Sequence, residues 1–153
     1  MDLSPCLARD IADLTTFLAT ADLTISGIEE PGVRIWVERD DSGEMVGSTG
    51  YELSGDGDHA LIRSVAVATP VRARGRGNAL ARFALARAAE GGATRAWLFS
   101  RRSGPFWQQL GFEPANRYEL AESLANTHQV RFFQQTGQLH NERAWSRAIK
   151  PQG

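Results

Sequence analysis

The chain has 153 residues, of which 42% are hydrophobic and 23% are charged, and its formal net charge is −1. This length and composition predict one domain over residues 1–153, and the small net charge argues against a nucleic-acid-binding or membrane-surface protein. The single cysteine, Cys6, excludes an intrachain disulfide and fits a reducing compartment. The sequence contains neither a run of about 20 apolar residues nor a basic start followed by an apolar segment, so we expect a cytoplasmic protein.

The first half of the chain predicts one helix followed by a meander of strands. In Ala8–Ala19 the apolar residues recur at helical spacing, whereas Asp22–Val33 combines Gly, Pro and carboxylates and predicts a loop. Glycines inside the second strand, Gly47 and Gly50, indicate a bulge or the close approach of a backbone or ligand. The strands are expected at Arg34–Glu38, Glu44–Leu53 and Ala60–Ala68.

The second half of the chain predicts helices alternating with strands, so that the fold class is mixed α/β. From Asn78 to Glu90 the apolar residues follow a helical period, and Gly91-Gly92 ends this helix. The next strand, Ala93–Ser100, follows a helical crossover and is expected to lie parallel to the strand before that helix. A short helix, a short strand, one or two helices and a last strand should follow at Gly104–Leu110, from Phe112, at Arg117–Thr136 and at Glu142–Ile149.

A turn of arginines and glycines joins the third strand to the long helix and reads Arg72-Ala73-Arg74-Gly75-Arg76-Gly77. A Gly-rich turn that opens a helix gathers backbone N–H groups at the positive end of the helix dipole, which makes it an anion site. Two other interpretations are a Gly-rich helix start without function and a nucleic-acid patch of the five arginines between Arg72 and Arg87. The apolar residues among these arginines argue against nucleic acid. The turn is not a P-loop, because no Gly-Lys-Ser/Thr ends it.

Two motifs together resemble a known family. Arg72-x-x-Gly75-x-Gly77, after Val65-Ala66-Val67, resembles the acyl-CoA signature of the GNAT acetyltransferases, Gln/Arg-x-x-Gly-x-Gly/Ala. Residues Phe106–Phe112 resemble the aromatic pair and short helix that end in Leu-Gly-Phe in that family. The order of elements is also similar from about Ala8 to Ile149. The resemblance implies the acyl-CoA N-acyltransferase fold, with a central, mostly antiparallel, splayed sheet flanked by helices.

The resemblance also implies acetyl-CoA as the cofactor and assigns residues to it, with no metal. The strands on either side of the crossover would separate and admit the thioester. Backbone groups of Val65 and Val67, with Ala66 between them, would bind the acetyl-pantetheine arm like an added strand. Ser100 and Phe106 would line the far side of the cleft. The pyrophosphate would be held by backbone N–H groups of Arg72, Ala73, Arg74, Gly75, Arg76, Gly77 and Asn78.

One position departs from the family pattern. Trp107 stands where many family members have a tyrosine that protonates the leaving thiolate. An indole N–H is a donor only and is no useful acid at neutral pH. Ser100, Ser103 or an ordered water would take this role, or the thiolate would leave with little help, since a free thiol has a pKa of about 8.5.

Two candidates for acceptor chemistry lie on the strands before the turn. Glu52 is the candidate catalytic base, the alternative being a solvated strand carboxylate. Arg63 is the candidate substrate-binding residue, and it would either clamp a substrate carboxylate or pair with Glu52 or Asp56. Strand alternation is expected to place Arg63 on one largely apolar face with Leu61, Val65 and Val67.

The sequence therefore predicts an acetyl-CoA-dependent N-acetyltransferase that acts on a small, amino-acid-like amine by direct attack on the thioester. Ile62–Val67 and Gly50-x-Glu52 are most similar to the arsenic-resistance and amino-acid N-acetyltransferases. A protein N-terminal or lysine acetyltransferase is an alternative, favoured if the Asp22–Val33 loop leaves an open groove. A non-catalytic CoA-binding module is another, suggested by the missing tyrosine. No nucleic-acid or membrane partner is expected, and a homodimer is left open.

Overall fold

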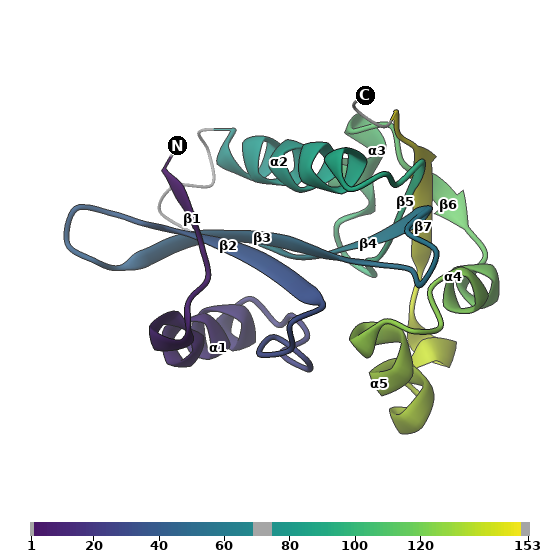
Figure 1. Ribbon diagram of the computed structural model, residues 1–153, viewed down its shortest axis with the longest axis horizontal. Coiled ribbons are helices and arrows are strands. Elements are labelled where there is room, and N and C mark those ends of the chain that lie inside the picture. The colour runs from purple at the N-terminus through teal and green to yellow at the C-terminus, as the bar shows by residue number, and fades with distance from the viewer. Residues whose placement is uncertain (1, 69–74, 151–153) are drawn as a thin grey trace.

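The computed structural model of the protein describes residues 2–68 and 75–150 (Figure 1). The strands of this part are β1 (Leu3–Pro5), β2 (Val33–Arg39), β3 (Met45–Leu53), β4 (His59–Val67), β5 (Arg95–Phe99), β6 (Glu113–Ala115) and β7 (Ala144–Ala148). They form one sheet in the order β1-β2-β3-β4-β5-β7-β6. The α-helices are α1 (Ile11–Thr20), α2 (Arg76–Glu90), α3 (Gly104–Gln109), α4 (Arg117–Ser123) and α5 (His128–Thr136), and two 3-10 helices are η1 (Ala8–Asp10) and η3 (Gln138–Asn141).

The strand pairing confirms the predicted mixed α/β fold. β2, β3 and β4 form the expected antiparallel meander, and β5 lies parallel to β4 after the α2 crossover. β7 pairs antiparallel with both β5 and β6. The sequence did not predict β1, because three residues are too few to show an alternation. Pro5 is tolerated there since β1 is an edge strand that pairs only with β2.

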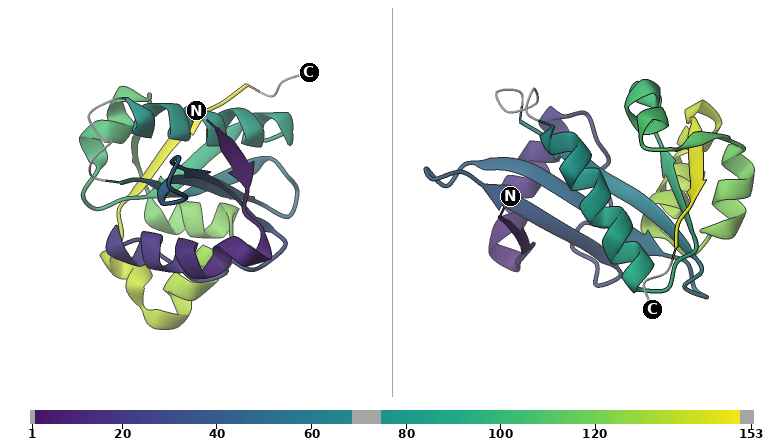
Figure 2. Two further views of the ribbon diagram at one scale, coloured as in Figure 1. Left: turned by 90° about the vertical axis from the view of Figure 1, so that its left-hand side faces the viewer. Right: turned by 90° about the horizontal axis from the view of Figure 1, so that it is seen from above.

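Helices cover both faces of the sheet. Figures 1 and 2 show α2 on one face, with α1 and α5 on the other. On the α2 face, Ile62 and Ala84 belong to a buried cluster that also includes Trp107. On the opposite face, Leu14 and Leu18 of α1 pack with strand residues such as Ile35. A third cluster joins α4 and α5 to the sheet through Leu61, Leu120, Leu124, Val130 and Phe133.

β4 and β5 pair only over their first residues. Their register ends where Leu61 lies opposite Trp97, although β4 continues to Val67 and β5 continues to Phe99. Beyond that point β4 pairs with β3 alone, and β5 pairs with β7. Figure 1 shows β5 and β7 running steeply across the direction of β2, β3 and β4. The expected splayed sheet is thus confirmed.

A β-bulge interrupts β4 just where it leaves β5. Ser64 and Val65 both lie opposite the single residue Thr49 of β3, at a shift in the β3–β4 register. Ser64 has a φ of 62°, in the left-handed region that few non-glycine residues adopt. The hydroxyl of Ser48 donates to the Ser64 carbonyl at 2.6 Å and supports this conformation.

The bulge changes which way the side chains of β4 face. An extra residue in a strand shifts the alternation by one position. Leu61 packs in the cluster with α4 and α5, whereas Val65 packs against the cluster under α2. The expectation that Leu61, Arg63, Val65 and Val67 share one face is therefore wrong.

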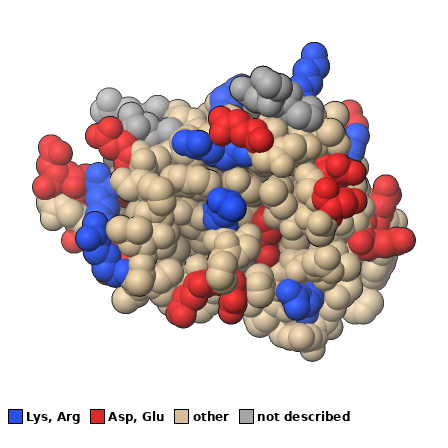
Figure 3. All heavy atoms as spheres, viewed as in Figure 1, with Lys and Arg blue, Asp and Glu red and all other residues tan. Residues whose placement is uncertain are grey.

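No helix within residues 2–68 and 75–150 is long and apolar enough to cross a membrane. On the face shown in Figure 3, blue and red side chains of the described residues are interspersed over the surface. Neither sign of charge dominates that face.

Candidate functional site

A cleft of about 320 Å³ opens where β4 and β5 separate. One wall is β4 around the bulge, and the other is the end of β5 with the segment that follows it. Residues of the loop after α1, of α5 and of η3 also line it. The lining residues are Ala21, Asp22, Leu23, Thr24, Ile62, Arg63, Ser64, Val65, Leu98, Phe99, Ser100, Arg101, Arg102, Trp107, Gln129, Phe133, Gln138 and Glu142.

A second cavity of about 550 Å³ adjoins the cleft and reaches the start of α2. Four residues line both cavities: Ala21, Leu23, Val65 and Trp107. The structure therefore joins the splayed strands to the Gly-rich start of α2 by one path. Of the sequence-predicted cofactor residues, this second cavity brings together Val65, Ala66, Val67, Gly75, Gly77, Asn78 and Phe106, while Ser100 lines the first.

The start of α2 fits an anionic group such as a pyrophosphate. Gly75 is the N-cap residue in a left-handed conformation, with a φ of 72°. A Cβ atom on Gly77 would lie 3.4 Å from Phe106 Cε1 and 3.7 Å from Val67 Cγ2, so a larger side chain would occupy the space between these residues. The first N–H groups of a helix have no acceptor within it and carry the positive end of its dipole. The predicted residues Arg72, Ala73 and Arg74 lie outside the described residues.

Arg63 is held entirely by protein groups. Its side chain is 1% exposed, and Nη1 donates to Glu52 Oε2 at 2.9 Å. Nη2 donates to the carbonyls of Ser26 at 2.7 Å and Thr24 at 3.3 Å. Burial lowers the pKa of the guanidinium, and the Glu52 carboxylate opposes this shift. Of the two partners weighed from the sequence, Arg63 thus pairs with Glu52, while Asp56 accepts from a serine hydroxyl in its own turn.

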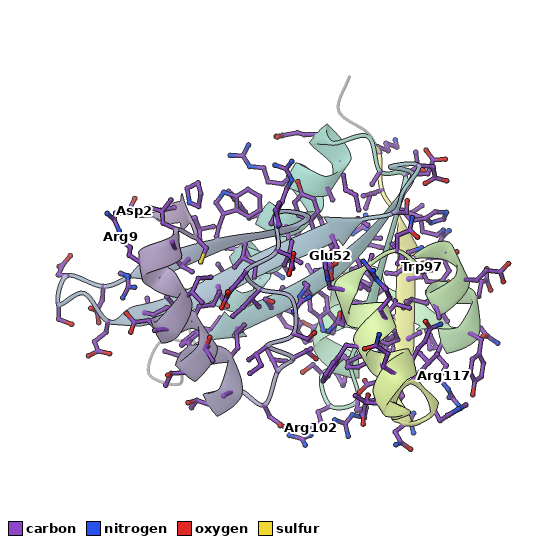
Figure 4. The ribbon with its side chains drawn as sticks, turned by 60° about the horizontal axis from the view of Figure 1, so that its bottom comes forward. Asp2, Arg9, Glu52, Trp97, Arg102 and Arg117 are labelled. Atoms are coloured by element: carbon purple, nitrogen blue, oxygen red, sulfur yellow. The ribbon has the colours of Figure 1, made fainter. Side chains whose placement is uncertain are left out.

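Glu52 lies beneath the first turn of α5. Its Oε1 accepts from the backbone N–H of His128 at 2.6 Å, and Oε2 accepts from that of Gln129 at 3.3 Å. A carboxylate is stabilised at a helix N-terminus by the dipole. Figure 4 shows Glu52 within the molecule, on the sheet face that α5 covers. Glu52 is not among the described residues that line the cleft, and both of its oxygens are engaged.

Two polar residues of the cleft, Glu142 and Gln129, did not stand out in the sequence. Glu142 precedes β7 and is 6% exposed, and Gln129 in α5 is 8% exposed. Gln129 Oε1 is buried and has no hydrogen-bond partner among the described residues. Neither residue belongs to a motif, and each is far in sequence from β4. Only the packing of α5 on the sheet and the pairing of β7 within it bring them to the cleft.

Residues 8–112 match the family model described as the acetyltransferase (GNAT) family. The chain belongs to this family. Membership confirms the resemblance derived from the two motifs, together with the N-acetyltransferase class and the cosubstrate acetyl-CoA. No protein of curated function matches the chain.

Several solved structures share this fold. N-acetylglutamate synthase from Neisseria gonorrhoeae, complexed with coenzyme A and N-acetyl-glutamate, is 18% identical with a TM-score of 0.75. That match covers 97% of this chain and 35% of the synthase, so this chain spans about a third of that protein's length. The Mycobacterium tuberculosis protein Rv2747 in complex with CoA (15% identical, TM-score 0.75) and a GNAT acetyltransferase from Staphylococcus aureus (15%, 0.74) each match over 97% of this chain and 99% of their own.

The aromatic pair of this GNAT chain builds the wall between the two cavities. Trp107 is buried and packs edge-to-face against Phe106, with ring centroids 4.9 Å apart, and against Phe112 at 5.4 Å. It borders both cavities at the position where the family pattern has tyrosine. Nearby, the Ser100 hydroxyl oxygen accepts from the N–H of Ser103 at 3.1 Å. Both serines predicted as substitutes for the acid thus lie in one turn after β5.

Proposed function

We propose that this acetyltransferase transfers the acetyl group of acetyl-CoA to the amine of a small, amino-acid-like molecule. The observation that carries this proposal is that Arg63 forms hydrogen bonds with the loop after α1. Its bonds to the Thr24 and Ser26 carbonyls fasten that loop beside β4, where Leu23 and Thr24 line the cleft. A loop fastened there leaves a cleft of about 320 Å³, which suits a free small molecule better than a peptide chain.

The charges in the cleft support a zwitterionic acceptor. Glu142 and Arg101 face one another there at 3.4 Å, so an anionic and a cationic group lie side by side. Arg102 adds a second guanidinium at the rim, where its side chain is 71% exposed (Figure 4). An amino acid carries an ammonium and a carboxylate that are similarly close to each other. The cleft therefore offers Glu142 to the ammonium of such an acceptor, and Arg101 to its carboxylate.

We assign the cofactor to the path between the cleft and α2. Acetyl-CoA supplies the acetyl thioester that the amine attacks. The backbone of Val65, Ala66 and Val67, the side chain of Phe106 and the Ser100 turn would hold its arm, and the amides from Arg72 to Asn78 its pyrophosphate. The bulge takes Val65 out of regular strand pairing, so its N–H can stabilise the negative charge that develops on the carbonyl oxygen.

The sequence suggested Glu52 as the catalytic base and Arg63 as a clamp for a substrate carboxylate. We propose instead that both residues position other parts of the site. The contacts of Glu52 support a positioning role, because it fixes the first turn of α5 and thereby Gln129. The contacts of Arg63 support a second positioning role, on the loop that bounds the acceptor. We also propose a cytoplasmic location, which the single cysteine of the sequence supports.

The test is release of free CoA thiol from acetyl-CoA with a panel of amino acids, simple amines, and peptides with a free N-terminus or an internal lysine. We expect turnover with at least one small amino-acid-like amine and much weaker turnover with peptides. Peptides that outperform every free amine would instead support the protein acetyltransferase. Tight binding of acetyl-CoA without turnover of any acceptor would support the binding module.

A further inference from the structure

We infer that Glu142 and Gln129 together recognise the acceptor. Glu142 binds the attacking amine and takes its proton, and Gln129 accepts a hydrogen bond from a second N–H or O–H group of the same molecule. This inference rests on the proposed function, since it describes the acceptor end of the same cleft. It narrows the acceptor to small primary amines that carry a further hydrogen-bond donor.

Glu142 is the carboxylate that the cleft itself offers. Among the described residues that line the cleft, the only other acid is Asp22. The side chain of Asp22 is 64% exposed and pairs with Arg102 at 2.7 Å, whereas that of Glu142 is 7% exposed. Glu52 does not line the cleft, and both of its carboxylate oxygens accept hydrogen bonds from protein groups. An amine inside the cleft therefore meets Glu142 before any other carboxylate.

The side chain of Glu142 is oriented but retains an oxygen for a ligand. Gln138 Nε2 donates to Oε2 at 2.7 Å, and Arg101 Nε lies 3.4 Å from the same oxygen. Both contacts use Oε2, so we assign Oε1 to the acceptor amine. An ionised carboxylate forms strong, short hydrogen bonds with an ammonium group, which fixes the direction of the nitrogen.

Gln129 supplies the second contact. A buried amide oxygen is almost always hydrogen-bonded in a folded protein, because leaving it unpaired is costly. Gln129 Oε1 has no partner among the described residues, and its side chain lines the cleft. The backbone N–H of Gln129 is anchored on Glu52 Oε2 at 3.3 Å, which fixes the residue in place. A donor on the bound acceptor would complete this oxygen's hydrogen bonding.

The chemistry balances with these residues. The bound ammonium first gives one proton to Glu142, which passes it to solvent, so that the nitrogen carries a free electron pair. The neutral amine nitrogen then forms a bond to the acetyl carbonyl carbon while the carbon–sulfur bond breaks, and CoA departs with the electron pair of that broken bond as the thiolate. The second proton lost by the nitrogen passes to Glu142 and from there to solvent. The acceptor leaves as the acetamide.

The experiment compares acceptor pairs that differ only in the second donor, such as serine with alanine, and glycinamide with its N,N-dimethyl amide. In the wild-type enzyme we expect kcat/KM to favour the donor-bearing member at least tenfold. Gln129→Met, which keeps the size of the side chain, should remove this preference. Glu142→Gln should lower kcat at least 100-fold, and Glu142→Asp should restore part of it. The dissociation constant of acetyl-CoA, measured by calorimetry, should be the same for each variant as for the wild type.

Glu122→Gln on the exposed surface of α4 is the matched control and should change none of these values. A wild-type enzyme that acetylates amines without preferring the donor-bearing member would overturn the role of Gln129. Full turnover in Glu142→Gln would overturn the role of Glu142. Absence of turnover with every amine, in an enzyme that binds acetyl-CoA, would instead reject the proposed function.

Discussion

Arg63 and Glu52 form a buried ion pair, with 2.9 Å between Nη1 and Oε2 and side chains that are 1% and 3% exposed. The pair ties together segments that are far apart in the sequence. Glu52 comes from β3 and caps the first turn of α5, and Arg63 comes from β4 and holds the loop at Thr24 and Ser26. Both ends of the acceptor cleft thus depend on one contact between adjacent strands.

Removing one partner of this pair should cost more stability than removing both. In Arg63→Met the Glu52 carboxylate loses its cation inside the protein, and we expect the free energy of unfolding to fall by about 3–5 kcal/mol. The double variant Arg63→Met/Glu52→Gln leaves no charge at these two positions and should lose less than Arg63→Met alone. Urea denaturation of wild type and variants measures these differences.

Glu90→Gln provides the control for that series. It breaks the exposed Arg87–Glu90 pair, whose atoms are 3.2 Å apart, and should cost less than about 1 kcal/mol. If Arg63→Met were no more destabilising than Glu90→Gln, the buried pair would not have the structural role given to it above.

Gly77→Val should weaken acetyl-CoA binding without unfolding the protein. The new side chain would start 3.4 Å from Phe106 and extend into the cavity at the start of α2. We expect the dissociation constant measured by calorimetry to rise at least tenfold, with a melting temperature close to that of the wild type. Gly32→Val is the control, because its Cβ would meet no atom within 4 Å. Unchanged binding in Gly77→Val would argue that the cofactor takes another path.

Gly50→Ala should destabilise the meander. The sequence indicated a bulge or a close approach here, and a Cβ at Gly50 would lie 2.5 Å from the carbonyl oxygen of Arg34 and 2.9 Å from Ile35 Cγ1. Since Arg34 contributes backbone, β2 must shift, and we expect a loss of about 1–3 kcal/mol in urea denaturation. Gly32→Ala should be close to neutral. A stable Gly50→Ala would mean that β2 and β3 can separate at no cost.

Asp10 should make stability depend on pH in the acid range. The backbone N–H of Leu7 (2.9 Å) and the guanidinium of Arg39 (3.0 Å) lower the pKa of its carboxyl group. A carboxyl whose pKa is lower in the folded protein stabilises the fold above its unfolded pKa of about 3.9, and this contribution is lost as pH falls through the folded value. Asp10→Asn removes the charge from this pair and should therefore cost up to about 1 kcal/mol at pH 7, and progressively less below about pH 4.

Thermal unfolding between pH 7 and pH 3 measures this convergence. Asp41→Asn, at an exposed turn position, is the control and should track the wild type throughout. A gap between wild type and Asp10→Asn that stays constant down to pH 3 would contradict the role of the Asp10 charge.

Local patterns in the sequence determined most of the elements of this protein and its family. Hydrophobic period, turn residues and crossover logic place the meander, α2 and the parallel β5 correctly, because these depend on neighbouring residues. The spacing from Arg72 to Gly77, combined with Phe106–Phe112, identifies the family for the same reason. Both motifs are short, contiguous pieces of chain, and their glycines and aromatic residues are visible in the sequence.

Only the tertiary structure decided how the acceptor half is assembled. Side-chain alternation along β4 is interrupted at the Ser64 bulge. A residue is extra only relative to the partner strand, so the hydrophobic pattern of β4 alone does not reveal it. Arg63 pairs with Glu52 and not with Asp56, because strand register, and not distance along the sequence, determines which charged side chains come into contact. Glu142 and Gln129 reach the cleft through the packing of β7 and α5, contacts between distant parts of the chain that no local pattern encodes.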